Sequence, residues 1–242
     1  LGGAQLYLHE LLTRLMAGSD VTATVCSPVD GPLRGALETM GVPVHLTDAF
    51  SPDDPHQHEW QVAELAGWAA HQGFNAALVN TIVAFPGVHV AELLGIPSVL
   101  TVHESFELDQ LLLEMHGPGV THPYVRDQVR QALRKADATV FVADATRRQY
   151  APEAADPSRF VTLPYGIELD AIRTFRDSTP RPVARRKLGI DESARLVLCL
   201  GTLEPRKSQA MLAQAFAALG RDHEDVVLAL VGARGNEHEE AL

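Results

Sequence analysis

The chain has 242 residues and a formal net charge of −11, with 46% hydrophobic and 21% charged residues. This length and composition are typical of a globular protein with one large domain or two modest ones. The acidic balance argues against a nucleic-acid partner, because such binding depends on basic side chains that neutralise phosphates.

No apolar run approaches the roughly 20 residues that a membrane-spanning helix needs, and no signal-peptide pattern is present. Cys26 and Cys199 lie inside apolar runs that are far apart in the sequence. Unpaired cysteines of this kind are typical of proteins in a reducing compartment. We therefore expect two buried thiols rather than a disulfide, and a cytoplasmic protein.

Short apolar runs alternate with helical patterns along the whole chain. Apolar residues recur at helical spacing within residues 6–15, 62–69 and 125–133. The predicted strands, in chain order, are residues 21–26, 43–46, 75–80, 97–102, 138–143, 159–164, 195–200 and 226–231. Strands that are apolar on both faces and separated by helices are typical of parallel sheets covered on both sides. The predicted fold class is α/β, with doubly wound parallel sheets.

A domain boundary is predicted where prolines and charges replace this rhythm, within residues 175–187. We place the N-terminal domain at residues 1–178 and a partial C-terminal domain at residues 179–242. About 60 residues are marginal for an independent core, so the second domain is expected to be the first half of a doubly wound unit. The first strand of the N-terminal domain is likewise expected to be missing before Leu1.

Ligands of open α/β sheets bind at the carboxyl ends of the strands, and Gly2 and Gly3 open the first predicted helix. Glycine lets a ligand approach the backbone, and the free N–H groups of a helix N-terminus attract phosphate. The alternative is a tight turn that packs the helix on a strand.

Two further candidates follow predicted strands. His103 comes directly after "PSVLTV" and could donate to a sugar hydroxyl or stabilise charge; alternatively, it satisfies loop carbonyls. Glu104, beside it, could belong to a helix start. Gly166, in "LPYGIELD", follows another strand, and a simple chain crossing explains it better than ligand binding does.

The stretch "GTLEPRKSQ" lies between a predicted strand and a predicted helix, and it contains Gly201, Thr202, Arg206 and Lys207. Basic residues at a helix N-terminus oppose the helix dipole, which is easier to understand if an anion binds there. Arginine recognises phosphate with two hydrogen bonds, and lysine adds a mobile point charge. The alternative is a solvated basic turn.

Other polar patterns in the sequence are weaker evidence for a functional site. Arg126, Arg130 and Arg134 recur every four residues, which favours a solvated helix face and leaves a peripheral membrane contact as the alternative. No metal site is expected, because four further histidines do not follow a recognised metal-ligand spacing: His56, His58, His116 and His122.

Seven segments, in this order, resemble the retaining glycosyltransferases of family 4, which have the GT-B fold of two facing Rossmann-like domains. The resemblance covers nearly the whole chain. The segments are "GGAQLYLHELLTRL", "GPLRGALETMGVPV", "LGIPSVLTVHES", "ADATVFVADATRRQY", "VTLPYGIELD", "GTLEPRKSQAMLAQAF" and "VVLALVGARG".

The resemblance implies roles for the candidates. Gly2 and Gly3 match a glycine loop near the donor phosphate and the acceptor, and His103 matches a histidine near the transferred sugar. Arg206 and Lys207 match a basic pair that grips the donor diphosphate. The implied donor is a nucleotide-diphosphate sugar such as a UDP- or GDP-sugar, used without metal or cofactor and with retention by front-face attack. The implied acceptor is a carbohydrate, a lipid or a small molecule, so that a contact with the inner face of the membrane stays open.

The chain departs from the family pattern at two points. Thr202 stands where many members have arginine, and the family's E-x7-E motif is expected beyond Leu242. This chain is therefore expected to be a fragment that is inactive by itself. Two alternatives remain, a GT-B nucleotide-sugar epimerase and a non-catalytic nucleotide-binding α/β module.

Overall fold

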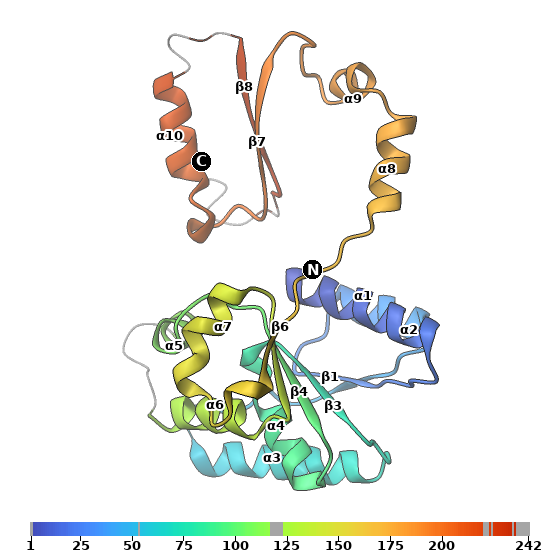
Figure 1. Ribbon diagram of the computed structural model, residues 1–242, viewed down its shortest axis with the longest axis vertical. Helices are drawn as coiled ribbons and strands as arrows, with labels where there is room; N and C mark the ends of the chain where they lie inside the picture. The colour runs from blue at the N-terminus through green and yellow to red at the C-terminus, as the bar shows by residue number, and fades with distance from the viewer. Residues whose placement is uncertain are drawn as a thin grey trace. The chain divides into compact units, whose positions relative to one another are not determined.

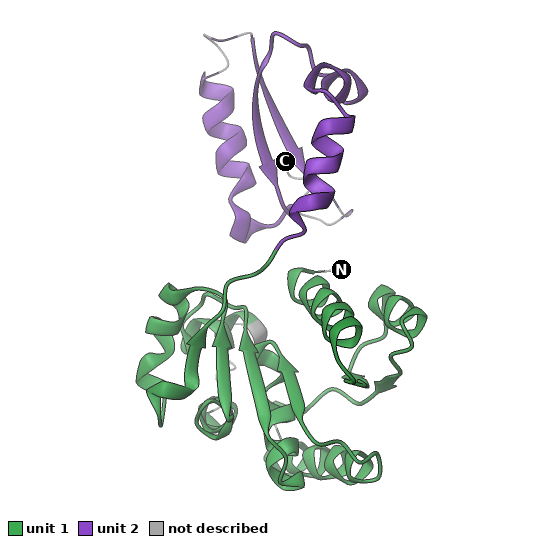
Figure 2. Cartoon of the chain, turned by 45° about the vertical axis from the view of Figure 1, so that its right-hand side comes forward, with its two compact units in different colours: residues 1–166 green, residues 167–242 purple. Residues whose placement is uncertain are grey.

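A computed structural model describes residues 2–52, 54–116, 123–219, 223, 225–233 and 235. The chain divides into two compact units, residues 1–166 and 167–242 (Figure 2). The division falls before helix α8 (Leu169–Ser178), whereas the boundary expected from the sequence falls at its C-terminal end.

The described strands of unit 1 form two parallel sheets (Figure 1). The larger has the strand order β3-β4-β5-β6, and the smaller pairs β1 with β2. Leu100, at the centre of the larger sheet, lies opposite Val79 on one side and Thr139 on the other. Within each sheet all strands are parallel, so their carboxyl ends lie at the same edge of that sheet. The strands are β1 (Val25–Ser27), β2 (Val44–Leu46), β3 (Ala77–Asn80), β4 (Ser98–Val102), β5 (Ala138–Phe141) and β6 (Phe160–Thr162).

Helices connect the strands of unit 1, and local sequence signals set their ends. Asp54 precedes the helix of residues 55–70 and accepts hydrogen bonds from the backbone N–H groups of His56 and Gln57 at 2.9 and 3.1 Å. Gly95 ends the helix of residues 86–94 with a φ of 65°. The helices are α1 (Gly3–Gly18), α2 (Pro32–Thr39), α3 (Pro55–Ala70), α4 (Pro86–Leu94), α5 (Leu108–His116), α6 (Pro123–Lys135) and α7 (Asp144–Tyr150), with 3₁₀ turns η1 (Ile82–Ala84), η2 (Ala151–Glu153) and η3 (Pro157–Arg159).

The main core lies around the larger sheet. Leu100 and Val102 of β4 and Phe141 of β5 are fully buried, and they belong to one cluster with Ile82 and Val129. Burial of such side chains stabilises the fold by about 1.5–3 kcal/mol each. The strand ends of this sheet are thereby a rigid support for the residues that follow them.

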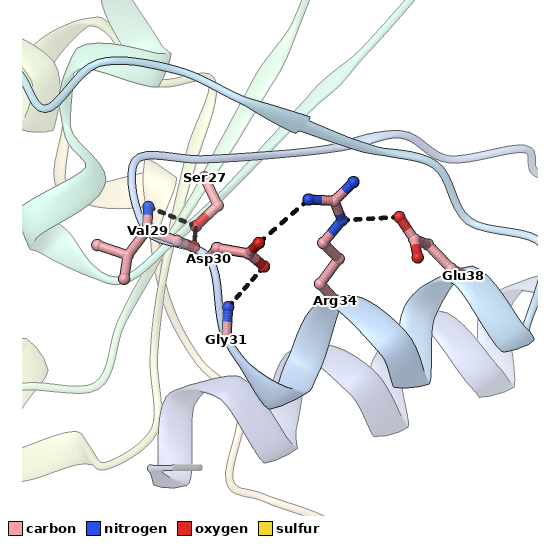
Figure 3. Close-up of polar contacts among 6 residues, drawn as sticks. All are labelled: Ser27, Val29, Asp30, Gly31, Arg34 and Glu38. Atoms are coloured by element: carbon pink, nitrogen blue, oxygen red, sulfur yellow. Dashed lines mark hydrogen bonds and ion pairs between the residues drawn. The ribbon is translucent and has the colours of Figure 1, made fainter.

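The loop between β1 and α2 is held by its own side chains (Figure 3). Asp30 accepts from the backbone N–H of Gly31 at 2.8 Å and pairs with Arg34 at 3.2 Å. Arg34 also donates to Glu38 at 2.8 Å, and Ser27 donates to the carbonyl of Val29 at 2.8 Å. The hydrogen bond with Glu38 is the main cause of the raised pKa of Arg34. This arginine is engaged by two carboxylates and is a poor candidate for anion binding.

In the described residues of unit 2, β7 (Arg195–Leu200) and β8 (Val226–Val231) form one parallel pair, in register from Arg195↔Val226 to Leu200↔Val231. Helix α10 (Gln209–Leu219) lies between these strands in the chain and contacts β8. The other described elements of unit 2 are α8 (Leu169–Ser178), α9 (Arg181–Lys187) and the 3₁₀ turn η4 (Pro205–Lys207).

The predicted burial of both cysteines is wrong. Cys26 is exposed and Cys199 is half-buried, and both are free thiols. Each lies in a two-stranded sheet, where the described neighbours cover less of a strand than in the four-stranded sheet. The same geometry leaves Leu198 and Leu200 of β7 51% and 69% exposed. Within the described ranges, no helix has the length and apolar character needed to cross a membrane.

Candidate functional site

The predicted site residues lie in both units. Unit 1 holds Gly2, Gly3, His103 and Gly166, and unit 2 holds Gly201, Thr202, Arg206 and Lys207.

His103 follows the carboxyl end of β4 and is fixed by Asn80, the last residue of β3. The Asn80 amide nitrogen donates to the carbonyl of Ala4 in α1 at 3.0 Å, which leaves Oδ1 facing His103 Nε2 at 2.8 Å. Because Oδ1 can only accept, Nε2 carries the proton. The structure thus brings the start of α1, next to Gly2 and Gly3, together with His103.

Two tyrosines enclose the imidazole of His103. The Tyr165 hydroxyl lies 2.5 Å from Nδ1 and donates to it, because Nδ1 is the unprotonated nitrogen. The two rings stack with centroids 5.7 Å apart and an interplanar angle of 19°. Tyr7 meets His103 edge-on, with centroids 4.9 Å apart, and lies 5.2 Å from Tyr165. Burial lowers the pKa of His103, which favours the neutral ring.

Glu104 supports the loop after β4. Its carboxylate accepts from the backbone N–H groups of Ile82 and His103 at 3.2 and 3.0 Å, and burial raises its pKa. It therefore ties this loop to η1 and does not cap α5, which begins at Leu108. The neighbouring Thr81 has a φ of 85°, a backbone conformation that is rare for a β-branched residue. Strain of this kind clusters at functional sites.

The glycines of unit 1 differ in what their backbone requires. Gly2 donates its N–H to Gln5 Oε1 at 2.8 Å, and an added Cβ would lie 2.6 Å from that oxygen. An added Cβ at Gly3 or Gly166 would meet nothing within 4 Å. Packing within the chain therefore does not require glycine at Gly3 or Gly166, and their ligand-binding roles remain predictions.

The basic turn of unit 2 differs from the sequence prediction. Arg206 and Lys207 lie in the 3₁₀ turn η4, and Ser208, with a φ of 55°, separates them from α10. The prediction that they stand at the start of the α-helix is wrong, because this left-handed residue delays the helix to Gln209. Arg206 and Lys207 therefore do not oppose the dipole of α10 from within its first turn.

The charges of this turn are nonetheless accessible. Arg206 pairs with Glu204 at 2.5 Å, and both Arg206 and Lys207 are exposed. Within the described part of unit 2, Lys207 makes no ion pair or hydrogen bond through its side chain. A flexible cation and a partly neutralised arginine are thus presented together at the end of β7.

A buried glutamine shapes the loop that leads to this turn. Gln209 is 0% exposed; its amide donates to the carbonyl of Thr202 at 2.9 Å and accepts from the backbone N–H of Glu204 at 3.4 Å. The ends of the two strands also touch, since an added Cβ at Gly232 would lie 2.1 Å from the Gly201 carbonyl oxygen. Backbone atoms around Gly201 and Thr202 are therefore closely determined.

A separate pocket of about 420 Å³ opens at the carboxyl end of β2, against α3. Its wall includes Asp48, Glu64 and Trp68, and Trp68 stacks on His45 with ring centroids 3.8 Å apart. This pocket was not predicted from the sequence, because its walls come from segments about 20 residues apart whose contact depends on the fold.

Four further residues that shape these sites were not predicted from the sequence: Tyr7, Asn80, Tyr165 and Gln209. Asn80 could have been found as a polar residue ending an apolar strand, and Tyr165 as the residue before Gly166. Gln209 lies on the apolar side of an otherwise ordinary helix and gives no such signal.

The arginines of α6 are held within unit 1. Arg126 pairs with Asp109 at 2.7 Å and Arg130 with Glu153 at 3.0 Å, while Arg134 donates to the Glu153 carbonyl at 3.4 Å. These contacts favour the interpretation of a solvated helix face. In the described parts of the chain, no three His, Cys, Asp or Glu side chains gather as a metal site; His122 lies outside those parts.

Comparisons with known proteins identify the family of this chain. A family model described as Glycosyltransferase Family 4 matches residues 1–171. The GDP-mannose-dependent alpha-(1-6)-phosphatidylinositol monomannoside mannosyltransferase of Mycolicibacterium smegmatis is 34% identical over 110 residues, which are 46% of this chain and 28% of that protein. The D-inositol 3-phosphate glycosyltransferase of Streptomyces scabiei is 28% identical over 234 residues, which are 90% of this chain and 51% of that protein.

A solved structure shows the same fold. HepE of Anabaena, crystallised with UDP-glucose, matches 99% of this chain and 60% of its own with a TM-score of 0.70 and 20% identity. The predicted α/β fold of GT-B type, with parallel sheets in Rossmann-like units, is confirmed. The chain spans about half or less of the length of these two relatives.

Proposed function

The chain belongs to Glycosyltransferase Family 4, and from that membership we propose that it serves the transfer of a sugar from a nucleotide-diphosphate sugar to a hydroxyl group of an acceptor. The transfer retains the anomeric configuration and needs no metal ion. The observation that carries this proposal is His103, held neutral among Asn80, Tyr7 and Tyr165 at the carboxyl ends of the strands.

The cluster around His103 suits a sugar. The amide of Asn80 and the two phenols around the neutral imidazole can exchange hydrogen bonds with hydroxyl groups. The aromatic rings offer apolar faces to the C–H groups of a pyranose. In contrast, no lysine or arginine contacts His103 among the described residues, so this cluster is suited to a neutral ligand rather than to phosphate.

Arg206 and Lys207 are proposed to bind the diphosphate. When the bond between the anomeric carbon and the diphosphate oxygen breaks, negative charge grows on the leaving group, and prearranged cations stabilise it. The acceptor oxygen attacks the same face of the anomeric carbon, and its proton passes to the departing phosphate oxygen. In unit 2, Gly201 and Thr202 are proposed donor contacts; in unit 1, the proposed donor contacts are Gly2, Gly3 and Gly166.

The names of the relatives suggest the acceptor class. One is a D-inositol 3-phosphate glycosyltransferase and another a phosphatidylinositol monomannoside mannosyltransferase. We therefore propose an inositol-bearing acceptor, either free or linked to a lipid. A lipid-linked acceptor would place the protein at the inner face of the cytoplasmic membrane.

The test is an acceptor-dependence assay on the protein that carries this chain. UDP-glucose, UDP-N-acetylglucosamine and GDP-mannose are each incubated with myo-inositol 3-phosphate or with phosphatidylinositol vesicles, and products are identified by mass spectrometry. A glycosylated acceptor supports the proposal, and its identity distinguishes the free acceptor from the lipid. Isomerised sugar nucleotide without any acceptor would indicate an epimerase, and binding without turnover would indicate a non-catalytic module.

A further inference from the structure

Both ring nitrogens of His103 are occupied by side chains from different parts of unit 1. Nε2–H donates to Asn80, whose amide is itself oriented by Ala4. Nδ1 accepts from the hydroxyl of Tyr165, which is 62 residues away in the sequence. Asn80 is half-buried at a strand end, whereas Tyr165 lies in the loop after β6 and is 48% exposed. Tyr165 is thus the more exposed of the two partners, and its contact with His103 is the one that the surroundings hold less firmly.

We propose that Tyr165 is a positioning residue. Its hydroxyl donates to Nδ1 and keeps that nitrogen unprotonated beside the Nε2–H that Asn80 sets, and its ring fixes the plane of the imidazole. A hydrogen bond to the unprotonated nitrogen stabilises the neutral ring and opposes protonation. The stacked arrangement, with centroids 5.7 Å apart, limits rotation of the imidazole. The proposal deepens the proposed function and rests on it for its catalytic meaning, because it assigns the protonation state of the residue next to the transferred sugar.

The remaining surroundings of His103 cannot replace this contact. Tyr7, from α1, meets the ring by its edge, and its hydroxyl bonds with the side chain of Thr101. Glu104 accepts the backbone N–H of His103 and not a ring proton. Together with Tyr165, these are the titratable side chains that contact His103 in the described structure. Tyr165 is therefore the one among them that can set the state of Nδ1.

The position of Tyr165 gives the contact a second meaning. Tyr165 and Gly166 are the last residues of unit 1, and unit 2 begins at Ile167. Gly166 is exposed, and an added Cβ there would meet nothing within 4 Å. The contact of Tyr165 with Nδ1 therefore lies at the edge of unit 1.

The test measures the tautomer and the pKa of His103 by NMR in the 242-residue chain labelled with ¹⁵N-histidine, with the signals assigned through His103→Gln. Tyr165→Phe keeps the ring and removes the hydroxyl, and Tyr7→Phe is the matched control. In the parent chain, Nδ1 should give an unprotonated and Nε2 a protonated ¹⁵N signal at pH 7.5. Tyr165→Phe should raise the pKa of His103 by about one half to one unit, and Tyr7→Phe should leave it in place.

Two results would overturn the proposal: an unchanged pKa and Nδ1 signal in Tyr165→Phe, or an equal rise in Tyr7→Phe. In the transferase assay, the acid limb of the pH–rate profile should move to higher pH in Tyr165→Phe. The NMR result does not depend on turnover. If no sugar transfer is found with any donor while Tyr165→Phe shifts the pKa, the proposed function fails and the positioning role stands.

Discussion

Asn80 joins His103 to the first helix: its Oδ1 lies 2.8 Å from His103 Nε2, and its amide nitrogen lies 3.0 Å from the carbonyl oxygen of Ala4. One side chain at the end of β3 therefore orients a residue at the end of β4 and anchors α1. The strand edge alone would bring these segments near one another. The amide determines which nitrogen of the imidazole carries the proton.

Asn80→Asp should raise the pKa of His103. A carboxylate in hydrogen-bond contact favours the imidazolium, and such a pair shifts a pKa by about 1–3 units. Where this shift carries the folded pKa above the unfolded value, the pair adds stability that is present below the unfolded pKa and is lost as pH rises through the folded pKa. NMR titration measures the shift. Asn75→Asp, at an exposed position before β3, is the control. An unchanged or lowered pKa of His103 in Asn80→Asp would show that the side chain of residue 80 does not contact the imidazole.

Gly232→Ala should destabilise unit 2. Its φ of 134° suits glycine, and an added Cβ would lie 2.1 Å from the Gly201 carbonyl oxygen, so the ends of β7 and β8 must separate. Backbone strain of this kind costs about 1–3 kcal/mol. Hydrogen exchange at the amide of Gly201, which donates to Val231 at 2.9 Å, should accelerate at least tenfold. Gly166→Ala, where a Cβ is free, should leave this exchange unchanged.

Two buried hydroxyls should be dispensable. Tyr150 Oη and Thr139 Oγ1 are buried and have no hydrogen-bond partner among the described residues. Removing an unsatisfied buried group relieves a penalty of about 1–3 kcal/mol, so Tyr150→Phe and Thr139→Val should each raise the free energy of unfolding. Urea denaturation followed by the fluorescence of Trp60 and Trp68, both in unit 1, measures it. Leu100→Ala, the reference, should lower it by about 2–5 kcal/mol; a loss of stability in both hydroxyl variants would show that the groups are satisfied.

Acidification should weaken unit 1 through two buried histidines. Burial lowers the pKa of His58 and His89 below 6.5, so their stability contribution is complete above pH 6.5 and is lost as pH falls through the folded pKa values. His58 is 2% exposed, and its Nε2 has no partner in the described structure.

The measurement compares the loss of unfolding free energy between pH 7.5 and 5.5. The loss should shrink in His58→Asn/His89→Gln, whose amides can keep the hydrogen bonds to the Ser51 and Gln128 carbonyls. The raised pKa of Glu104 acts in the opposite direction, but it is common to both proteins and cancels in the comparison. The exposed His56→Gln serves as control, and a pH dependence identical in all three proteins would contradict the account.

Glu204→Gln should strengthen nucleotide-diphosphate binding if Arg206 contacts the phosphates. The carboxylate now pairs with Arg206, and an exposed pair of this kind is worth about 0.2–1 kcal/mol. Its removal should increase affinity about two- to fivefold at low ionic strength, and the gain should fade in high salt. Glu10→Gln, which removes an exposed partner of Arg14 in unit 1, should have no effect on affinity. Weaker binding in Glu204→Gln would point to a direct role of Glu204 in the site.

Local signals predict much of the fold. The predicted strands at residues 195–200 and 226–231 coincide with β7 and β8, because leucine and β-branched residues without glycine or proline fill most of both segments. The start of α10 could not be predicted in the same way. A left-handed Ser208 interrupts an otherwise continuous helical pattern, and serine carries no signal for that conformation.

The candidate site was predictable only in part. His103 stands out because a histidine ends an apolar strand. Tyr7 and Tyr165 are far from it in sequence, and their contacts arise only when α1, β4 and β6 are brought together. The burial of Cys26 was mispredicted for a related reason, since an apolar run does not show whether neighbouring strands cover it.

The most direct test of the account is calorimetric titration of the chain with UDP, GDP and ADP, beside the Arg206→Ala/Lys207→Ala variant. Hydrogen bonds to charged groups are worth about 1.5–3 kcal/mol each, so one nucleotide should bind saturably and lose at least tenfold in affinity in the variant. Binding that is equal in both proteins, or no saturable binding of any nucleotide, would contradict a donor site at the turn after β7.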